Sequence, residues 1–243
     1  MKIVSNPQLT QFSEFIESVP LQFDKGGLLI YKNRNEIRVF NVNGSALNVK
    51  RFKPPIIFNR FIYTFFRLSK AQRSFQYALK LIEMDIETPQ PVAYIHIKKR
   101  GLLYDSYYIS RQANYNRTLY EFGKGSVEGR EHILSAFAGF TADIHEKRVL
   151  HKDYSPGNIL FKEENETVTF CIVDINRLRF GDVPVNKGCL NFVRLWGQKS
   201  FFDIVVRKYA EIRNADPEAC LKLTLKARKK FWKRYARKHE MPF

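Results

Sequence analysis

A histidine, an aspartate and an asparagine stand at close spacing in the chain: His151, Asp153 and Asn158. An aspartate five residues before an asparagine, after a histidine and before an apolar strand, is typical of a loop that transfers phosphoryl groups. In such loops the aspartate orients an acceptor hydroxyl and takes its proton, while the asparagine holds a Mg²⁺ that bridges phosphates. We therefore expect Asp153 to be the catalytic base and His151 to be a structural hydrogen-bonding residue.

A second carboxylate follows this loop at the end of a predicted hairpin. Residues 159–161 and 168–173 have the composition of strands, and the acidic turn 163–166 joins them. Asp174 comes directly after the second strand, so its side chain is expected to face the same cleft as Asn158. Because Mg²⁺ prefers a few carboxylate or amide oxygens together with phosphates, Asn158 and Asp174 are the predicted metal ligands.

A lysine on a short strand is expected to supply a phosphate contact. Strands are predicted at 28–31, 37–42 and 46–52, and Asn43-Gly44 between the last two tolerates the positive φ of a tight hairpin turn. Lys50 lies near the end of the third strand, where a lysine contacts the α- and β-phosphates of a bound nucleotide.

Further nucleotide contacts are expected around this sheet. The first hairpin has no GxGxxG, and Lys32 and Arg34 stand in its place, where they are expected to cover the phosphates. Ser110 and Gln112 lie where the sequence pattern changes and are also predicted to contact the nucleotide. The predicted cofactors are ATP and Mg²⁺, with these residues as their binding set: Lys50, Lys32, Arg34, Ser110, Gln112, Asn158 and Asp174.

The sequence divides into a strand-rich part and a helix-rich part. Besides the three strands, the first part contains a helix at 70–84 with Ser69 as its N-cap, and it has two more predicted strands at 92–97 and 104–109. Helices in the second part are predicted at 127–148, as a pair within 189–213, and at 216–239. The predicted fold is α+β with two lobes that share a cleft. Residues 1–110 form a small N-lobe with a five-stranded antiparallel sheet and one helix, and residues 111–243 form a larger, mostly helical C-lobe.

The composition favours an anionic partner. The 243 residues carry a formal net charge of +17, which suits a nucleic acid, a nucleotide, a phosphorylated glycolipid or a membrane surface. No run of about 18 apolar residues is present, so any membrane contact is expected to be peripheral. The three widely spaced cysteines have neither zinc nor disulfide spacing and are expected to be reduced thiols of a cytosolic protein.

Several motifs occur in an order that identifies a family resemblance over roughly residues 20–215. They are Val49-Lys50-Arg51-Phe52, Ser69-Lys70-Ala71, Thr88-Pro89-x-Pro91, His151-Lys152-Asp153 through Asn158-Ile159-Leu160, and Val173-Asp174-Ile175-Asn176-Arg177. With them the chain resembles the lipopolysaccharide core kinases of the Kdo/heptose kinase type, a divergent branch of the protein-kinase-like fold. The resemblance implies ATP as donor and a sugar hydroxyl of the lipopolysaccharide inner core, Kdo on lipid A, as acceptor. It also implies Asp153 as base, Asn158 and Asp174 as metal ligands, and Lys50 as phosphate clamp.

Departures from protein kinases bear on the acceptor and on activity. Ser155 stands where Ser/Thr protein kinases have a lysine, and no Ala-Pro-Glu follows Asp174, which disfavours a peptide acceptor. The helix at 70–84 offers Gln76 where a glutamate would pair with Lys50, and Glu83 lies two turns further on. A working enzyme is still expected, because the base and both metal ligands are present.

Two other functions stay open at this point. An atypical protein kinase of RIO-like type, or a kinase associated with nucleic acid, is suggested by the net charge. A catalytically weakened pseudokinase that serves as a binding module is suggested by Gln76. Our expectation is a lipopolysaccharide precursor as acceptor, an anionic membrane surface, no nucleic acid and no obligate protein partner.

Two segments are candidates for membrane contact, each with a structural alternative. The aromatic residues Phe58, Phe61, Tyr63, Phe65 and Phe66 are expected either to enter lipid or the acceptor's acyl region, or to pack on the N-lobe. The last helix is expected either to lie on anionic lipid or to be the solvated face of a docked helix. Its cations are Lys222, Lys226, Arg228, Lys229, Lys230, Lys233, Arg234, Arg237 and Lys238, and its apolar residues are Leu221, Leu225, Trp232 and Tyr235. The expected location is cytoplasmic, peripheral on the inner membrane. The remaining histidines, His96, His132, His145 and His239, are assigned no chemistry.

Overall fold

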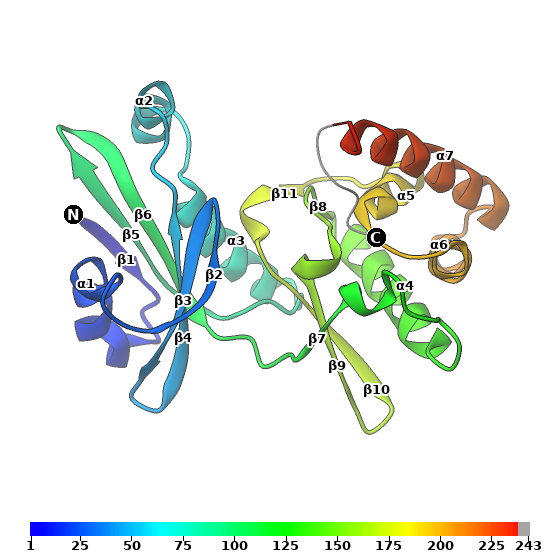
Figure 1. The fold of residues 1–243 in the computed structure, drawn as a ribbon, viewed down its shortest axis with the longest axis horizontal. Helices are drawn as coiled ribbons and strands as arrows, with labels where there is room; N and C mark the ends of the chain where they lie inside the picture. Colours follow the sequence, from blue (N-terminus) through cyan, green and yellow to red (C-terminus); the bar gives the residue numbers. More distant parts are fainter. Residues whose placement is uncertain (238–243) are drawn as a thin grey trace. The chain divides into compact units, whose positions relative to one another are not determined.

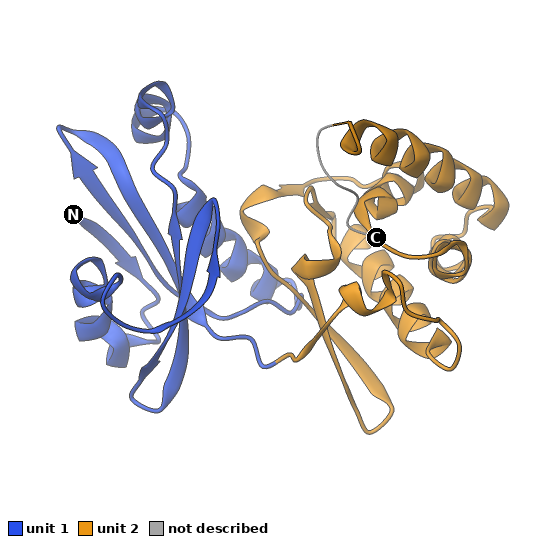
Figure 2. Cartoon of the chain, in the orientation of Figure 1, with its two compact units in different colours: residues 1–114 blue, residues 115–243 orange. Residues whose placement is uncertain are grey.

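The chain divides between Asn114 and Tyr115 into two units, residues 1–114 and 115–243 (Figure 2). The structure is a computed structural model, and it describes residues 1–237. Among these residues, no helix is both long enough and apolar enough to cross a membrane. The assignment of a nucleotide-binding lobe to residues 1–110 and a catalytic lobe to residues 111–243 stays a prediction.

A six-stranded antiparallel sheet is the centre of unit 1 (Figure 1). Its order is β1 (Lys2–Ser5), β5 (Pro91–Lys99), β6 (Leu102–Arg111), β4 (Ser45–Phe52), β3 (Asn35–Val42) and β2 (Leu28–Lys32). The predicted count of five strands is therefore one too low. The missing strand is β1, a four-residue segment that pairs with β5 far along the chain.

Helices cover both faces of this sheet. One face packs against α1 (Ser13–Gln22) and the 3-10 turn before it, Thr10–Phe12, and this cluster contains Phe12, Ile16, Leu47 and Val49. The other face packs against α3 (Lys70–Glu83), where Ala71 and Phe75 contact Phe52 and Tyr94. Side chains alternate along a strand, so Leu47 and Val49 of β4 face α1 while Lys50 and Phe52 face α3.

Local signals in the sequence specify the predicted turns and caps. Asn43 and Gly44 both have positive φ, 51° and 73°, in the two-residue turn between β3 and β4. Ser69 Oγ accepts a hydrogen bond from Gln72 N at 3.0 Å and so caps α3. The helices of unit 1 are more numerous than the single one predicted, because α1 and α2 (Ile57–Phe65) accompany α3.

Unit 2 combines short strands with four α-helices in its described part (Figure 1). Its strands are β7 (Arg117–Thr118), β8 (Val149–His151), β9 (Ile159–Glu164), β10 (Thr167–Ile172) and β11 (Leu178–Phe180). Its helices are α4 (Glu131–Glu146), α5 (Val185–Asn191), α6 (Lys199–Ile212) and α7 (Pro217–Tyr235), with 3-10 turns at Leu119–Phe122, Pro156–Asn158, Ile175–Arg177 and Phe192–Arg194. Helix α6 packs against α4 and α7, and α5 packs against α7. Large aromatic residues fill the core between them, among them Phe137, Tyr154, Phe192, Phe201 and Tyr209.

The last helix docks on unit 2 through its apolar side. Asp216 accepts hydrogen bonds from Glu218 N and Ala219 N, with Pro217 at the first helical position, as the sequence predicts. Leu221 and Trp232 are buried, so the apolar stripe of α7 is covered by the protein and its exposed side is cationic. The helix is therefore docked, and contact of its cationic side with anionic lipid stays a prediction. The predicted helix ran to residue 239, and Lys238 and His239 lie outside the described residues.

Candidate active site

The β9–β10 hairpin brings the two predicted metal ligands into neighbouring positions. Ile159 pairs with Ile172, and Val173 N donates to Asn158 O at 3.0 Å, so the ladder extends to the residue before Asp174. The predicted hairpin is therefore present, with its acidic turn. Two residues that are sixteen positions apart in sequence lie side by side because the strands between them pair in register.

Asp174 adopts a backbone conformation that is uncommon for its residue type. Its φ is 54° and its ψ is 41°, which is the left-handed region. Asn176 Nδ2 donates to Asp174 Oδ1 at 2.7 Å and helps fix the carboxylate. Such a conformation costs roughly 1–3 kcal/mol and is concentrated at functional sites, which agrees with the role predicted for Asp174.

The oxygens of this pair fit a magnesium ion. Asn158 Nδ2 donates to Asp153 O at 2.8 Å, so the amide nitrogen is committed and Oδ1 is the atom left to bind a cation. With a carboxylate from Asp174, the donors are hard oxygens, and the phosphates of a nucleotide would complete the shell. Within residues 1–237 no group of three or more His, Cys, Asp or Glu side chains forms a separate metal cluster.

His151 joins the two loops through both of its ring nitrogens. Asp153 N–H donates to Nδ1 at 3.1 Å, and Nε2 lies 3.0 Å from Val173 O. A backbone N–H only donates and a carbonyl only accepts, so the ring must be neutral with its proton on Nε2. The ring is fully buried, and burial lowers its pKa. The prediction of a structural role for His151 is consistent with this geometry.

A chain of hydrogen-bonded polar groups contacts the main-chain carbonyl of His151. Asn191 Nδ2 donates to His151 O at 2.9 Å, and Asn191 Oδ1 lies 3.0 Å from His145 Nε2. His145 Nδ1 then accepts from the Tyr209 hydroxyl at 2.9 Å, and Arg213 Nη1 donates to the same hydroxyl oxygen at 3.1 Å. Every donor in this chain meets an acceptor only if His145 is neutral with its proton on Nε2.

Two arginines contact the carboxylate of the predicted base. Arg177 Nη1 lies 3.1 Å from Asp153 Oδ2, and Arg194 Nη1 forms an ion pair with Asp153 Oδ1. Both guanidinium groups are partly exposed, and the carboxylate is 22% exposed. Arg194 also lies 5.4 Å from the centroid of the Phe231 ring, so α7 helps to position it.

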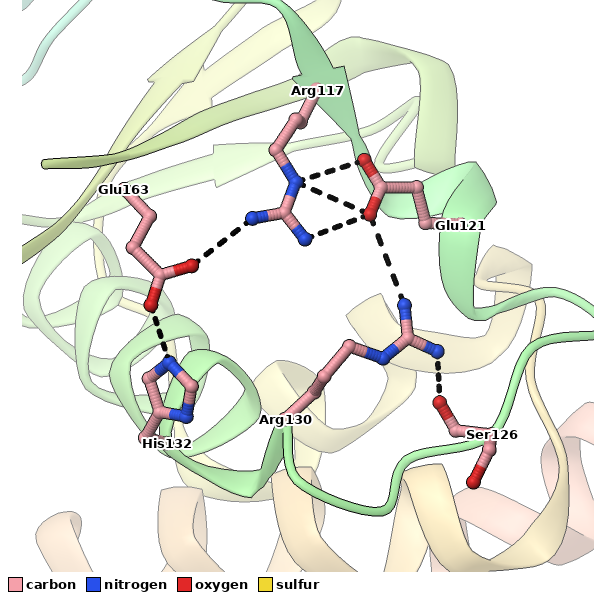
Figure 3. A network of polar contacts seen from close by, with 6 residues as sticks. All are labelled: Arg117, Glu121, Ser126, Arg130, His132 and Glu163. Atoms are coloured by element: carbon pink, nitrogen blue, oxygen red, sulfur yellow. Dashed lines mark hydrogen bonds and ion pairs between the residues drawn. The ribbon is translucent and has the colours of Figure 1, made fainter. Parts of the chain in front are cut away.

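A polar network joins β7, β9, the start of α4 and the turn that follows β7 (Figure 3). Arg117 contacts both Glu121 and Glu163, and Glu163 Oε1 lies 2.6 Å from His132 Nε2. Arg130 adds an ion pair to Glu121 and a hydrogen bond to Ser126 O. These contacts link β7, β9 and the start of α4 to the 3-10 turn Leu119–Phe122.

Tyr120, on that turn, packs directly on Gly157, in the loop that carries Asp153 and Asn158. A Cβ atom on Gly157 would lie 2.7 Å from Tyr120 Cε2, so only glycine allows the ring to approach this closely. The ring of Tyr120 also lies 4.6 Å from that of Trp196, centroid to centroid. Tyr120 and Gly157 therefore fix the backbone next to Asn158.

In unit 1, Lys50 lies among residues of the sheet face that α3 covers. Its register partners are Ile37 on β3 and Tyr108 on β6, and its Nζ lies 5.3 Å from the Phe52 ring centroid. Ser110 pairs with Asn48, and Asn48 Nδ2 donates to Gln112 Oε1 at 2.8 Å. Three predicted nucleotide contacts, Lys50, Ser110 and Gln112, are thus connected through β4 and β6.

The other predicted nucleotide contacts lie on the β2–β3 hairpin. Lys32 and Arg34 are exposed and line a cavity of about 400 Å³ together with Glu36, Arg51 and Lys53. Gln76, predicted to take the place of a pairing glutamate, is exposed on α3. Its role beside Lys50 stays a prediction.

The comparisons with known proteins agree with this arrangement. Residues 31–195 match the family model described as the lipopolysaccharide kinase (Kdo/WaaP) family. The chain belongs to this family. Because the match covers more than half of the chain, it establishes a lipopolysaccharide kinase and confirms the family resemblance seen in the sequence motifs.

A solved structure shows the same fold. It is WaaP in complex with acyl carrier protein, with a TM-score of 0.65 and 15% sequence identity over 97% of this chain and 100% of that one. The α+β, protein-kinase-like fold is therefore confirmed, with six strands in the first sheet instead of five. The acyl carrier protein bound to that neighbour is a kind of partner that was not predicted from the sequence.

Several residues that shape this site have no function predicted from the sequence. Arg177 directly follows the Asp174-Ile175-Asn176 motif, and this adjacency is a sequence signal that could have identified Arg177 as a site residue. Arg194 and Asn191 lie about 40 residues from their partners Asp153 and His151, and no local pattern identifies them. The close approach of Tyr120 to Gly157 likewise depends on tertiary structure.

We predict that stability falls as the pH is lowered from about 6.5 towards 4. Burial lowers the pKa of His145 and of His96 to about 4, and it also lowers the pKa of His151. Between the two pKa values the unfolded chain binds protons that the folded chain excludes, so the stabilisation is complete above pH 6.5 and is lost below it. For His145 the full loss is about 3 kcal/mol. Urea unfolding at pH 7 and pH 5 measures this.

A single substitution tests one of these rings. His96→Gln should reduce the pH dependence of the wild type between pH 5 and 7, because His96 is buried and its pKa is lowered to about 4. Equal free energies of unfolding of the wild type at pH 5 and pH 7 would contradict the prediction.

We predict that Gly157→Ala destabilises the protein by about 1–3 kcal/mol, because its Cβ overlaps the Tyr120 ring and a packed site tolerates extra volume poorly. Tyr120→Ala should largely remove this penalty in the double variant. Gly139→Ala is the matched control, since its Cβ would meet its nearest neighbour, Ile212 Cδ1, at an ordinary 3.9 Å. Urea unfolding of the wild type, the two single variants, the double variant and the control tests this, and equal penalties with and without Tyr120 would show that the ring is not the cause.

Proposed function

We propose that this lipopolysaccharide kinase transfers the γ-phosphoryl group of ATP to a hydroxyl of Kdo on a lipid A precursor. Asp153, held by its contacts with His151, Arg177 and Arg194, would act as the base, and Lys50 would contact the phosphates. We also propose a cytoplasmic location, peripheral on the inner membrane, because a precursor of this kind is anchored there. The choice of Kdo as acceptor rests on one observation, the contacts of Arg177 and Arg194 with the Asp153 carboxylate.

The proposed reaction is a direct displacement at phosphorus. The acceptor oxygen forms a bond to the γ-phosphorus as the bond to the β,γ-bridging oxygen breaks, and ADP leaves with that electron pair. Asp153 takes the proton of the acceptor hydroxyl and later releases it to solvent. Asn158 and Asp174 would hold Mg²⁺, which, when bound, neutralises charge on the phosphates.

The two arginines favour an acidic sugar over a neutral one. Kdo carries a carboxylate close to its hydroxyls, and a neutral heptose does not. Arginine binds carboxylates through geometrically matched, charge-assisted hydrogen bonds. An acceptor carboxylate that engages Arg177 and Arg194 would release the Asp153 oxygens to bind the hydroxyl proton. The carboxylate of the proposed substrate would therefore bind the same two guanidinium groups that form ion pairs with Asp153 when no acceptor is present.

The proposed function is tested with radiolabelled ATP and four reactions: Kdo-lipid A, a heptose-extended acceptor lacking accessible Kdo hydroxyls, a basic protein, and no acceptor. We expect label on Kdo-lipid A and a loss of about 10²–10⁴-fold in rate with Asp153→Asn. Label on protein alone would indicate the atypical protein kinase. No transfer, with ATP bound, would indicate the binding module, and activity restored by Gln76→Glu would trace the defect to α3.

We predict that Arg177→Ala and Arg194→Ala each raise the KM for Kdo-lipid A by about 10- to 100-fold, the value of one or two charge-assisted hydrogen bonds. The KM for ATP should change little. Arg179→Ala is the matched control, because Arg179 is an exposed arginine two residues from Arg177 on β11. Steady-state kinetics in both substrates measures this, and an equal rise in both KM values would rule out a specific role in acceptor binding.

A further inference from the structure

Helix α2 lies at one end of unit 1 (Figure 1). Its apolar side chains are exposed to solvent. No residue of this helix is buried. Phe58 is 72% exposed, Phe65 is 62% exposed and Phe66, directly after the helix, is 76% exposed. The α2 surface consists of Ile56, Ile57, Phe58, Phe61, Phe65 and Phe66.

The aromatic rings of the α2 surface contact one another rather than the core. The ring centroid of Phe61 lies 5.0 Å from that of Phe65 and 5.8 Å from that of Phe66. A contiguous exposed patch of this kind is rare on a soluble protein and marks an interaction site. The structural alternative of burial against the sheet does not hold for these rings.

Polar contacts fix the orientation of the helix. Thr64 Oγ1 accepts a hydrogen bond from Leu103 N on β6 at 2.9 Å. Arg60 Nε donates to Pro55 O at 2.8 Å, and its guanidinium lies 4.9 Å from the centroid of the Tyr104 ring. The helix is therefore attached to the sheet through its polar side, which directs the apolar side outward.

Cations surround the α2 surface. Lys99 lies 5.3 Å from the same Tyr104 ring as Arg60, so the basic turn at 98–100 and α2 are neighbours. Lys53 and Arg67, which flank the helix, are exposed as well. No Asp or Glu occurs between Glu36 and Glu83, so all the charged side chains of residues 37–82 are positive.

A cavity with cationic walls lies beside the helix. Its volume is about 430 Å³, and Asn59 and Tyr63 of α2 line it together with Arg34, Lys53 and Lys70. An apolar surface next to such a cavity matches the two parts of a phospholipid, its acyl chains and its phosphate.

We propose that α2 is a membrane-docking element that inserts its apolar side chains into an anionic bilayer, with the surrounding cations on the lipid phosphates. This inference gives the proposed peripheral location a specific structural basis, and it does not depend on the reaction catalysed. Helix α7 contributes less, because its apolar residues Leu221 and Trp232 are covered by unit 2.

The inference is tested by sedimentation of the full chain, without ATP or acceptor, with vesicles of phosphatidylethanolamine and phosphatidylglycerol. The triple variant Phe58→Ser, Phe65→Ser and Phe66→Ser should lose about tenfold or more in vesicle affinity, because each ring contributes buried apolar area in the bilayer. Leu21→Ser is the matched control, since Leu21 is 80% exposed on α1 of the same unit. The variant Lys229→Glu, Lys230→Glu and Lys233→Glu provides the comparison for α7.

A fluorescence measurement separates insertion from surface adsorption. Both native tryptophans, Trp196 and Trp232, are in unit 2. Phe58→Trp should add an emission that shifts to shorter wavelength with vesicles and is quenched by brominated lipid chains. An unshifted, unquenched emission would overturn the inference.

Two further outcomes would also overturn it. One is vesicle binding lost in the α7 variant and retained in the α2 variant. The other is binding of purified acyl carrier protein that the α2 variant alone abolishes while vesicle binding persists, which would assign the surface to a protein partner. Unchanged circular dichroism spectra would show that the variants remain folded. Phosphorylation of a detergent-dispersed acceptor by the α2 variant would show that docking and catalysis are separate.

Discussion

The arrangement of unit 2 depends on one buried neutral imidazole. His151 accepts a hydrogen bond from the backbone of Asp153 and donates one to the carbonyl of Val173, the residue before Asp174. The His151 ring therefore holds the backbone next to both the predicted base, Asp153, and a predicted metal ligand, Asp174. A charged ring would place a donor against a donor at Nδ1, so burial and the hydrogen bonds favour the same protonation state. Asn191, His145 and Tyr209 extend this constraint into the helices behind.

The carboxylate of Asp153, the predicted base, is well compensated without an acceptor. It is partly buried with a guanidinium group on each oxygen, so its oxygens are engaged. In the proposed reaction, proton transfer would require that the acceptor compete for the arginines. Recognition of an acidic acceptor would then be linked to exposure of the base, and water would be a poorer acceptor. Under the proposed function, selectivity for the acidic sugar and protection of the nucleotide would follow from the same two contacts.

Much of the fold could be predicted from the sequence where the signal is local. The Asn43-Gly44 turn, the Ser69 cap and the Asp216-Pro217 helix start depend on atoms within a few residues, and all three are present. The hairpin that joins Asn158 to Asp174 was predictable for the same reason.

Features that rest on tertiary structure were not predictable in this way. Strand β1 is four residues long, and neither its own sequence nor that of β5 predicts that the two strands pair. The aromatic residues of α2 are compatible with either a buried or an exposed position. Sequence periodicity predicts that one side of a helix is apolar, but it does not predict whether other elements cover that side. Arg194 reaches Asp153 through the packing of distant helices. The sequence motif thus predicted where the chemistry lies, and tertiary structure brings Arg194 and Asn191 to the residues of that motif.

The position of β1 has a consequence for how the protein folds during synthesis. This strand precedes the other strands of its sheet in the chain, yet β5, its neighbour in the sheet, begins at Pro91. The hairpin of β3 and β4 can form early from local contacts, while β4 must wait for β6 and β1 must wait for β5. The N-terminal strand therefore stays unpaired until most of unit 1 has been synthesised. During that interval α1 and its phenylalanine side chains lack the sheet face that covers them in the folded unit, and exposed apolar surface of this kind favours aggregation.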